Sequence, residues 1–197
     1  METWKKKAQL CSDIYHQPDR IFRGGIEYAG TGSGRSRAFA VCGTNGWRDW
    51  VYNLTAKKIS VPGMGVVHLG FFLAMQKVIK DFLLFTAQKP ADLCGHSAGA
   101  AIILQLAVYV SVMIPDGRQR IRNVCAVAPP KVGGAEFCET FRALFSDENC
   151  RLYTRRFDPV TKFPRGKYQH PYQHKLPSKA DGKFDHPIDG YIRLINE

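Results

Sequence analysis

The segment that most constrains the fold lies near the middle of the chain, at residues 92–106. It contains Gly95-His96-Ser97-Ala98-Gly99, which matches the pattern G-x-S-x-G. In this pattern the serine stands on a sharp turn from a strand into a helix, and a Cβ at either glycine would collide with a neighbouring element. Residues 92–94 can end a short strand. Residues 98–114 are apolar on almost every side, which predicts a long buried helix.

Strands and helices alternate along the chain. Helical periodicity covers residues 3–16, 69–88 and 135–145, and a short helix is expected at the C-terminal end. Strands are predicted at residues 20–28, 36–43, 123–128 and, as the last one, 151–155, with a further possible strand within 57–67. Residues 165–184 are predicted to be an extended surface segment. Alternation of this kind favours the α/β class, with a predominantly parallel central sheet and helices on both faces.

Length and cysteine usage limit the class of protein. A chain of 197 residues fits a single domain over residues 1–197 with a sizeable core. It contains no apolar stretch of the roughly 18 residues that a membrane span needs, and no apolar signal segment near Met1. The six cysteines are scattered without a C-x-x-C pair, which favours buried free thiols in a reducing compartment. We therefore expect a cytoplasmic protein.

The net charge of +11 would attract polyanions such as nucleic acid or anionic lipid head groups. The basic residues cluster at residues 5–7, 118–122 and 151–156, without the interleaved aromatics of single-strand binders, which argues against nucleic acid. A solvated surface or peripheral contact with an anionic membrane are the remaining interpretations. His170 and His174 have too few neighbouring ligand types to predict a metal site, and no cofactor is expected. The oligomeric state stays open.

A serine hydroxyl becomes a strong nucleophile when a base removes its proton and an acid orients that base. In one large class of serine hydrolases the chain order is Ser, then Asp or Glu, then His. The candidates downstream of Ser97 are His170, His174 and His186, with Asp158, Asp181 and Asp185. Asp158 follows the strand at 151–155, at the end where catalytic groups gather in α/β sheets. His186 opens the last loop, so this order favours Ser97, Asp158 and His186.

A second apolar feature lies just after the strand at 36–43. Trp47, Trp50, Val51 and Leu54 follow the i, i+3, i+4, i+7 rule and form one stripe on a short predicted helix. The stripe can pack into the core, or it can form a small lid or the wall of an acyl-chain pocket. Both interpretations stay open from the residues alone.

Several blocks carry a family pattern in a fixed order. They are residues 38–44 with 49–54, V-H-L-G-F at 67–71, G-H-S-A-G at 95–99, A-P-P-K-V-G at 128–133, D-P-V at 158–160 with Pro164, and His186 with Tyr191. Together these blocks resemble the class 3 lipases, the fungal-type triacylglycerol lipase family. Residues before Arg20 carry no part of the resemblance.

The resemblance implies an α/β-hydrolase fold and a role for each matched residue. Ser97 would be the nucleophile, Asp158 the orienting acid and His186 the base. The backbone N–H groups of Thr44 and Ala98 would form the oxyanion hole, and residues 44–54 would stand at the position of the family's lid. The implied activity is that of a lipase or esterase, a serine hydrolase that cleaves lipid esters through an acyl-enzyme without a cofactor.

Three alternatives remain beside this interpretation. The chain is shorter than most members of the family, which favours a minimal lid and esterase-like behaviour. The positive charge also suits a phospholipase acting on anionic membranes. From a different class, the chain could be a catalytically silent scaffold that binds a lipid or a protein partner.

Overall fold

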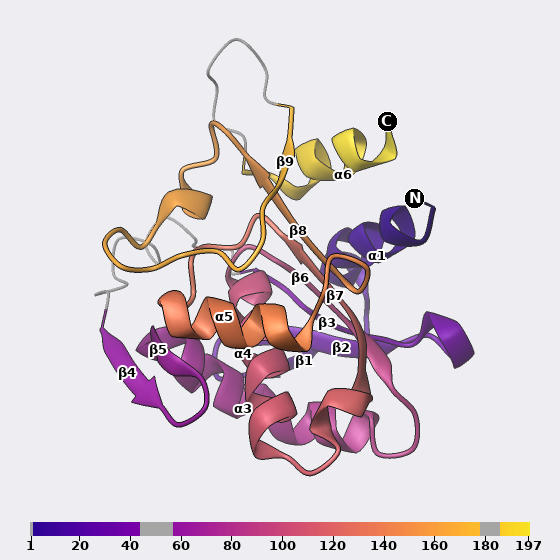
Figure 1. The fold of residues 1–197 in the computed structure, drawn as a ribbon. Helices are drawn as coiled ribbons and strands as arrows, with labels where there is room; N and C mark the ends of the chain where they lie inside the picture. The colour runs from indigo at the N-terminus through magenta and orange to yellow at the C-terminus, as the bar shows by residue number, and fades with distance from the viewer. Residues whose placement is uncertain (1, 44–56, 178–185) are drawn as a thin grey trace.

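The computed structural model describes residues 2–43, 57–177 and 186–197, and a seven-stranded sheet crosses this part of the chain (Figure 1). Its spatial order is β1-β2-β3-β6-β7-β8-β9. The first three strands pair antiparallel, and from β3 to β9 every pairing is parallel. The strands are β1 (Ile21–Arg23), β2 (Ile26–Thr31), β3 (Ala38–Val41), β6 (Ala91–His96), β7 (Ile121–Val127), β8 (Cys150–Arg155) and β9 (His174–Leu176).

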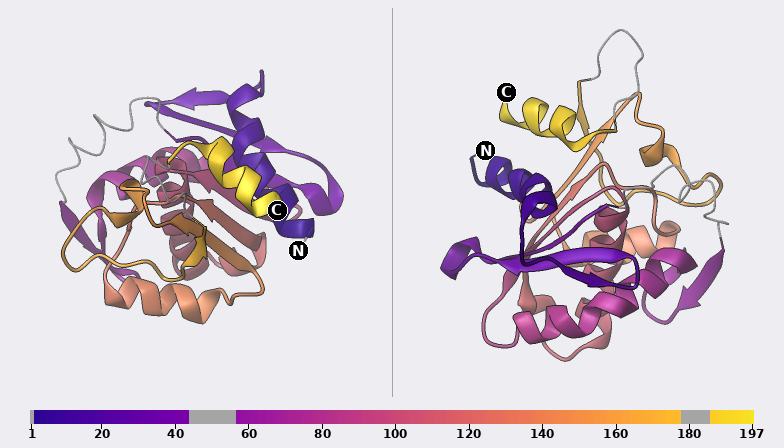
Figure 2. Two further views of the ribbon diagram at one scale, coloured as in Figure 1. Left: turned by 90° about the horizontal axis from the view of Figure 1, so that it is seen from above. Right: turned by 180° about the vertical axis from the view of Figure 1, so that it is seen from behind.

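Helices cover both faces of this sheet, as Figure 2 shows from two further directions. One face carries α3 (Leu69–Phe85), α4 (Ala98–Met113) and α5 (Ala135–Leu144), and the other carries α1 (Glu2–Asp13) and α6 (Ile188–Asn196) side by side. A separate hairpin of β4 (Lys58–Val61) and β5 (Gly65–His68) precedes α3. The predicted α/β class, with a mostly parallel sheet between two layers of helices, is confirmed.

The two faces of the sheet differ in side-chain size. Phe39 and Leu93 point to the face of α3 and α4, whereas Ala40, Cys94 and Cys125 point to the face of α1. Small side chains let α1 approach the strands closely, so that Cys11 Sγ lies 3.8 Å from the carbonyl oxygen of Cys125. The six cysteines are buried free thiols, as predicted.

Helix α4 is the central helix of the larger core. Its residues 98–108 are all buried, between the sheet and α3. The polar Gln105 fits this setting because its Nε2 donates to the carbonyl oxygens of His68 at 3.3 Å and Val132 at 3.0 Å. Among the helices within residues 2–43, 57–177 and 186–197, none has the length and apolarity that crossing a membrane requires.

Two sequence predictions of strands were wrong in detail. The strand predicted at residues 20–28 is a hairpin, because Gly24 and Gly25 adopt φ values of +57° and +84° and reverse the chain between β1 and β2. The segment at 165–184, predicted to be an extended surface segment, contains β9, so β8 is not the last strand as predicted. A three-residue strand is too short to show a period, and its pairing with β8 exists only in the folded chain.

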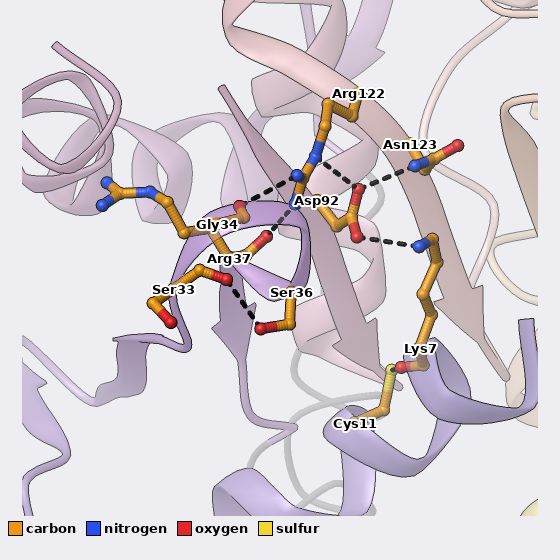
Figure 3. A network of polar contacts seen from close by, with 9 residues as sticks. All are labelled: Lys7, Cys11, Ser33, Gly34, Ser36, Arg37, Asp92, Arg122 and Asn123. Atoms are coloured by element: carbon orange, nitrogen blue, oxygen red, sulfur yellow. Dashed lines mark hydrogen bonds and ion pairs between the residues drawn. The ribbon is translucent and has the colours of Figure 1, made fainter. Parts of the chain in front are cut away.

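A buried ion pair joins α1 to the sheet at the end of β6 that is farther from Ser97 (Figure 3). Lys7 Nζ donates to Asp92 Oδ2 at 2.8 Å, and both residues are less than 10% exposed. Asn123 Nδ2 donates to Asp92 Oδ1 at 2.7 Å, and Arg122 Nε lies 3.3 Å from the same oxygen. Arg122 also donates to the carbonyl oxygen of Arg37 at 2.6 Å. Asp92 therefore ties α1, β7 and the segment before β3 to β6.

Replacing Asp92 tests this network. Asp92→Ala is expected to lower the free energy of unfolding by about 3–5 kcal/mol, because it leaves the buried Lys7 ammonium without a counter-charge. The exposed Asp19 is the control, and Asp19→Ala should change stability by less than about 0.5 kcal/mol. Urea unfolding followed by circular dichroism measures both, and equal stabilities for the two variants would contradict the role of Asp92.

Candidate active site

Ser97 occupies the turn between β6 and α4. Its φ of 57° and ψ of −124° lie in a region that side-chain-bearing residues rarely adopt. The Ser97 backbone N–H donates to the carbonyl oxygen of Val127 at 2.9 Å, which fixes the turn against β7. The hydroxyl is thereby held above the end of the sheet, at the N-terminus of α4, where backbone N–H groups and the positive end of the helix dipole point outward.

Both glycines of the motif are required by close packing. A Cβ on Gly99 would lie 2.1 Å from the carbonyl oxygen of Val41 and 2.5 Å from that of Cys42. A Cβ on Gly95 would lie 2.8 Å from the backbone nitrogen of Ala100. Helix α4 therefore begins in contact with the backbone of β3, and only glycine permits this approach.

The structure brings Ser97, His186 and Asp158 together. His186 Nε2 lies 2.8 Å from Ser97 Oγ, and His186 Nδ1 lies 2.9 Å from Asp158 Oδ2. Asp158 stands in the loop after β8 and His186 stands just before α6, so three separate segments supply the three groups. The three residues are between 0% and 3% exposed. This arrangement can move a proton from the serine hydroxyl to the imidazole.

Asp158 is oriented by three donors. Its Oδ2 accepts from His186 Nδ1 and from the Tyr191 hydroxyl at 2.8 Å, and its Oδ1 accepts from the Val160 backbone N–H at 2.9 Å. Burial and the adjacent Asp158 raise the pKa of Tyr191 well above its usual value, so Tyr191 stays a neutral donor. Because Asp158 accepts from Nδ1–H, the Nε2 of a neutral His186 carries the lone pair that can accept the serine proton.

A second hydrogen-bond chain contacts the backbone of His186. His96 Nε2 donates to the His186 carbonyl oxygen at 3.2 Å, and the Tyr15 hydroxyl donates to His96 Nδ1 at 2.9 Å. The Tyr15 oxygen in turn accepts from the Gly43 N–H at 2.7 Å. Burial, with a contribution from the neighbouring His186, lowers the pKa of His96 to about 3. His96 is therefore neutral, and one tautomer satisfies every bond in the chain.

The remaining predicted site residues divide into two groups. Ala98 lies within the described residues, as the first residue of α4. Gly43, which precedes the predicted Thr44 and was not itself predicted, is so near Ser97 that a Cβ on it would lie 2.9 Å from Ser97 Cβ. Thr44, Trp47, Trp50 and Leu54 lie outside the described residues. Within the described ranges, no three side chains of His, Cys, Asp or Glu are grouped to hold a metal ion. His174 instead accepts a hydrogen bond from the Leu152 N–H at 3.1 Å.

A protein-family model described as Lipase (class 3) matches residues 38–168. The chain belongs to the class 3 lipase family. Membership of this family supports hydrolysis of lipid carboxylic esters as the class of reaction. A comparison with curated protein sequences gives no significant match.

Solved structures of fungal lipases share the fold of this class 3 lipase. Lipase II from Rhizopus niveus superposes with a TM-score of 0.75 at 15% identity, over 90% of this chain and 80% of that one. The mono- and diacylglycerol lipase from Aspergillus oryzae gives 0.71 at 19% identity, over 90% and 80% of the two chains. Lip2 lipase from Yarrowia lipolytica gives 0.67 at 17% identity, over 96% and 82%. At these identities the similarity establishes the α/β-hydrolase fold.

The hydrogen-bond chain from Gly43 through Tyr15 to His96 was not predicted from the sequence. Tyr15 precedes both the resemblance and the segment that the family model matches. In the motif, His96 is only the variable position before Ser97. A histidine at that position could have indicated a polar contact near Ser97. Strand alternation directs its side chain to the face of the sheet where α1 and α6 pack.

The contact between α4 and β3 can be tested with two glycine variants. Gly99→Ala is expected to cost about 3 kcal/mol of stability, because its Cβ would overlap the backbone of β3. Gly134→Ala is the matched control, since the nearest atom to its Cβ is 3.7 Å away, and it should cost about 1 kcal/mol or less. Thermal unfolding of both variants provides the measurement. Similar losses in the two would show that α4 can move away from β3.

Proposed function

We propose that this class 3 lipase cleaves carboxylic esters of lipids through an acyl-enzyme. In this proposal Ser97 is the nucleophile, His186 the general base and Asp158 the orienting acid, and residues 1–197 form one catalytic domain. The observation that carries the proposal is the unbroken chain of hydrogen bonds at 2.8 Å and 2.9 Å from Ser97 through His186 to Asp158. A buried serine on a positive-φ turn beside a helix N-terminus adds to this support.

The proposed reaction has two steps. Ser97 Oγ attacks the ester carbonyl carbon while His186 Nε2 takes the hydroxyl proton, and His186 then donates that proton to the leaving alcohol oxygen. Water repeats the sequence on the acyl-serine and releases the carboxylic acid. The Ala98 and Thr44 N–H groups are the proposed donors to the oxyanion, and loss of one such donor typically costs about 3–4 kcal/mol of transition-state stabilisation.

His96 and Tyr15 are proposed as positioning residues. The imidazole of His186 becomes positive when it takes the serine proton, and the ring of His96 lies 5.1 Å away, measured between centroids. A second positive charge at that distance would oppose proton transfer, and the depressed pKa of His96 avoids it. The bond to the His186 carbonyl oxygen, at 3.2 Å, meanwhile holds the backbone that carries the base.

The substrate is proposed to be an acylglycerol or a simpler ester. Trp47, Trp50 and Leu54 are the residues proposed to form a lid or an acyl-chain wall. A phospholipase acting on anionic membranes is the second candidate, favoured by the net charge of +11. The buried free thiols suit a reducing compartment, so we propose a cytoplasmic location with peripheral membrane contact.

Ser97→Ala tests the proposed reaction. We expect hydrolysis of p-nitrophenyl esters to fall by about 10³-fold or more, because the nucleophile is absent. Labelling by a fluorophosphonate probe should be lost as well, since only an activated serine reacts. Ser111→Ala, on the same helix, is the control and should keep full activity. Undiminished hydrolysis by Ser97→Ala would refute the proposal, and an unlabelled wild-type serine would favour a silent binding scaffold.

Tyr15→Phe tests the positioning chain. The variant leaves His96 Nδ1 and the Gly43 N–H without their partner, and we expect kcat to fall about tenfold with little change in KM. The rate of fluorophosphonate labelling should fall by the same factor, because it depends on the same base. Tyr109→Phe, on α4, is the control with full activity expected. A Tyr15→Phe enzyme with wild-type kcat would show that the chain has no part in catalysis.

A further inference from the structure

A cavity of about 450 Å³ is lined in part by residues on either side of Asp158 in the sequence, among them Arg156 and Thr161. Its walls come from the loop after β7, the end of β8, the turn at Val160–Lys162 and β9. Five basic residues line it, and the described lining contains no carboxylate: Lys131, Arg155, Arg156, Lys162 and Lys175. Positive charges from four separate segments thus surround one space.

The two arginines of the lining already make contacts within the protein. Arg155 is 5% exposed, donates to the Pro177 carbonyl oxygen at 3.3 Å and lies over the Tyr191 ring. The guanidinium of Arg156 lies over the ring of Phe157. Lys131, Lys162 and Lys175 line the same space. Their three positive charges would attract an anion that entered it. The cavity is therefore suited to a compact, highly charged oxyanion such as a phosphate group.

The loop next to the cavity favours a lipid as the source of this anion. Phe163 is 36% exposed and follows directly after Lys162, one of the cavity lysines. The guanidinium of Arg165 lies 5.3 Å from the centre of its ring. The Phe163 carbonyl oxygen accepts from the Lys131 N–H at 2.7 Å, so this loop is fixed to the cavity wall. An exposed aromatic among cations is typical of segments that lie in the membrane–water interface.

We propose that the cavity lined by Lys131, Lys162 and Lys175 binds the phosphate of an anionic phospholipid head group while Phe163 enters the lipid interface. This docking site lies outside the proposed catalytic residues and does not require hydrolysis. It adjoins the acid loop, the loop after β8 that carries Asp158, because the cavity residue Thr161 donates through its Oγ1 to the Asp158 carbonyl oxygen at 3.0 Å. Docking would therefore bring the edge of the sheet that carries Asp158 to the membrane surface.

The site is tested by vesicle binding in the Ser97→Ala background, so that a failed binding test and a failed hydrolysis test are separate results. Sedimentation with phosphatidylcholine vesicles, with or without about 30% phosphatidylglycerol, measures the partition coefficient. Lys131→Gln/Lys162→Gln/Lys175→Gln is expected to lower anionic-vesicle binding about fivefold per lysine, and on the order of 100-fold in all. Lys77→Gln/Lys80→Gln/Lys89→Gln changes the net charge equally at exposed lysines of α3 and the turn after it. It should lower binding by about threefold at most.

Two further measurements test whether the cavity lysines form the binding site and whether the bound phosphate belongs to a lipid. Lys162→Gln/Lys175→Gln, which leaves the half-buried Lys131 in place, should lower binding on the order of 25-fold with an unchanged circular dichroism spectrum. Phe163→Ser should weaken vesicle binding about tenfold. Equal losses in the two triple variants would overturn the site. Wild-type vesicle binding by Phe163→Ser, together with release of the protein from vesicles by inorganic phosphate at about 1 mM, would assign the cavity to a free phosphate and overturn the lipid assignment.

Discussion

The approach of α4 to the backbone of β3 determines where the chemistry of this class 3 lipase can occur. Gly99 permits the contact with Val41 and Cys42, and the contact in turn places Ser97 in its positive-φ conformation at the end of β6. The same approach brings Gly43 beside Ser97. The serine, the start of a helix and the end of a neighbouring strand therefore converge because two glycines allow two backbones to touch.

The difference between the two faces of the sheet gives the N-terminal helix a part in the site. Alanine and cysteine side chains on one face let α1 lie close to the strands, and the Asp92 network fixes the helix at the far end of β6. The residues that follow α1 then carry Tyr15 to the near end, where its hydroxyl contacts His96 and Gly43. Packing that looks purely structural at one end of β6 thus positions a hydrogen-bond chain at the other.

The acid loop contributes both to the proposed catalytic residues and to the cationic cavity. Asp158 contacts His186 and Tyr191, and Thr161 and Lys162 of the same loop line the cationic cavity. The net charge of +11 is a property of the whole chain, but the fold concentrates five of its cations around one space. The composition gives only the total charge. The parallel pairing of β8 and β9 brings Arg155 and Lys175 to the same cavity.

Local patterns in the amino-acid sequence determined much of this protein by themselves. The glycines around Ser97, the apolar runs of the central strands and the helical periods identify the fold class, because each depends on residues that are close in sequence. The chain order after Ser97 singled out Asp158 and His186 because the loops that follow strands in an α/β sheet carry functional groups. The spacing of the cysteines likewise indicated free thiols, which the fold confirms.

Tertiary structure alone decided the features that join distant segments. The strand β9 is three residues long and forms only because β8 offers it an edge, and the hairpin at Gly24 depends on backbone angles that no hydrophobic period reports. Tyr15 and His96 are 81 positions apart, and no local pattern can relate two side chains across that separation. The same holds for the lysines of the cavity, since like charges from four segments come together only when the core holds their backbones in place.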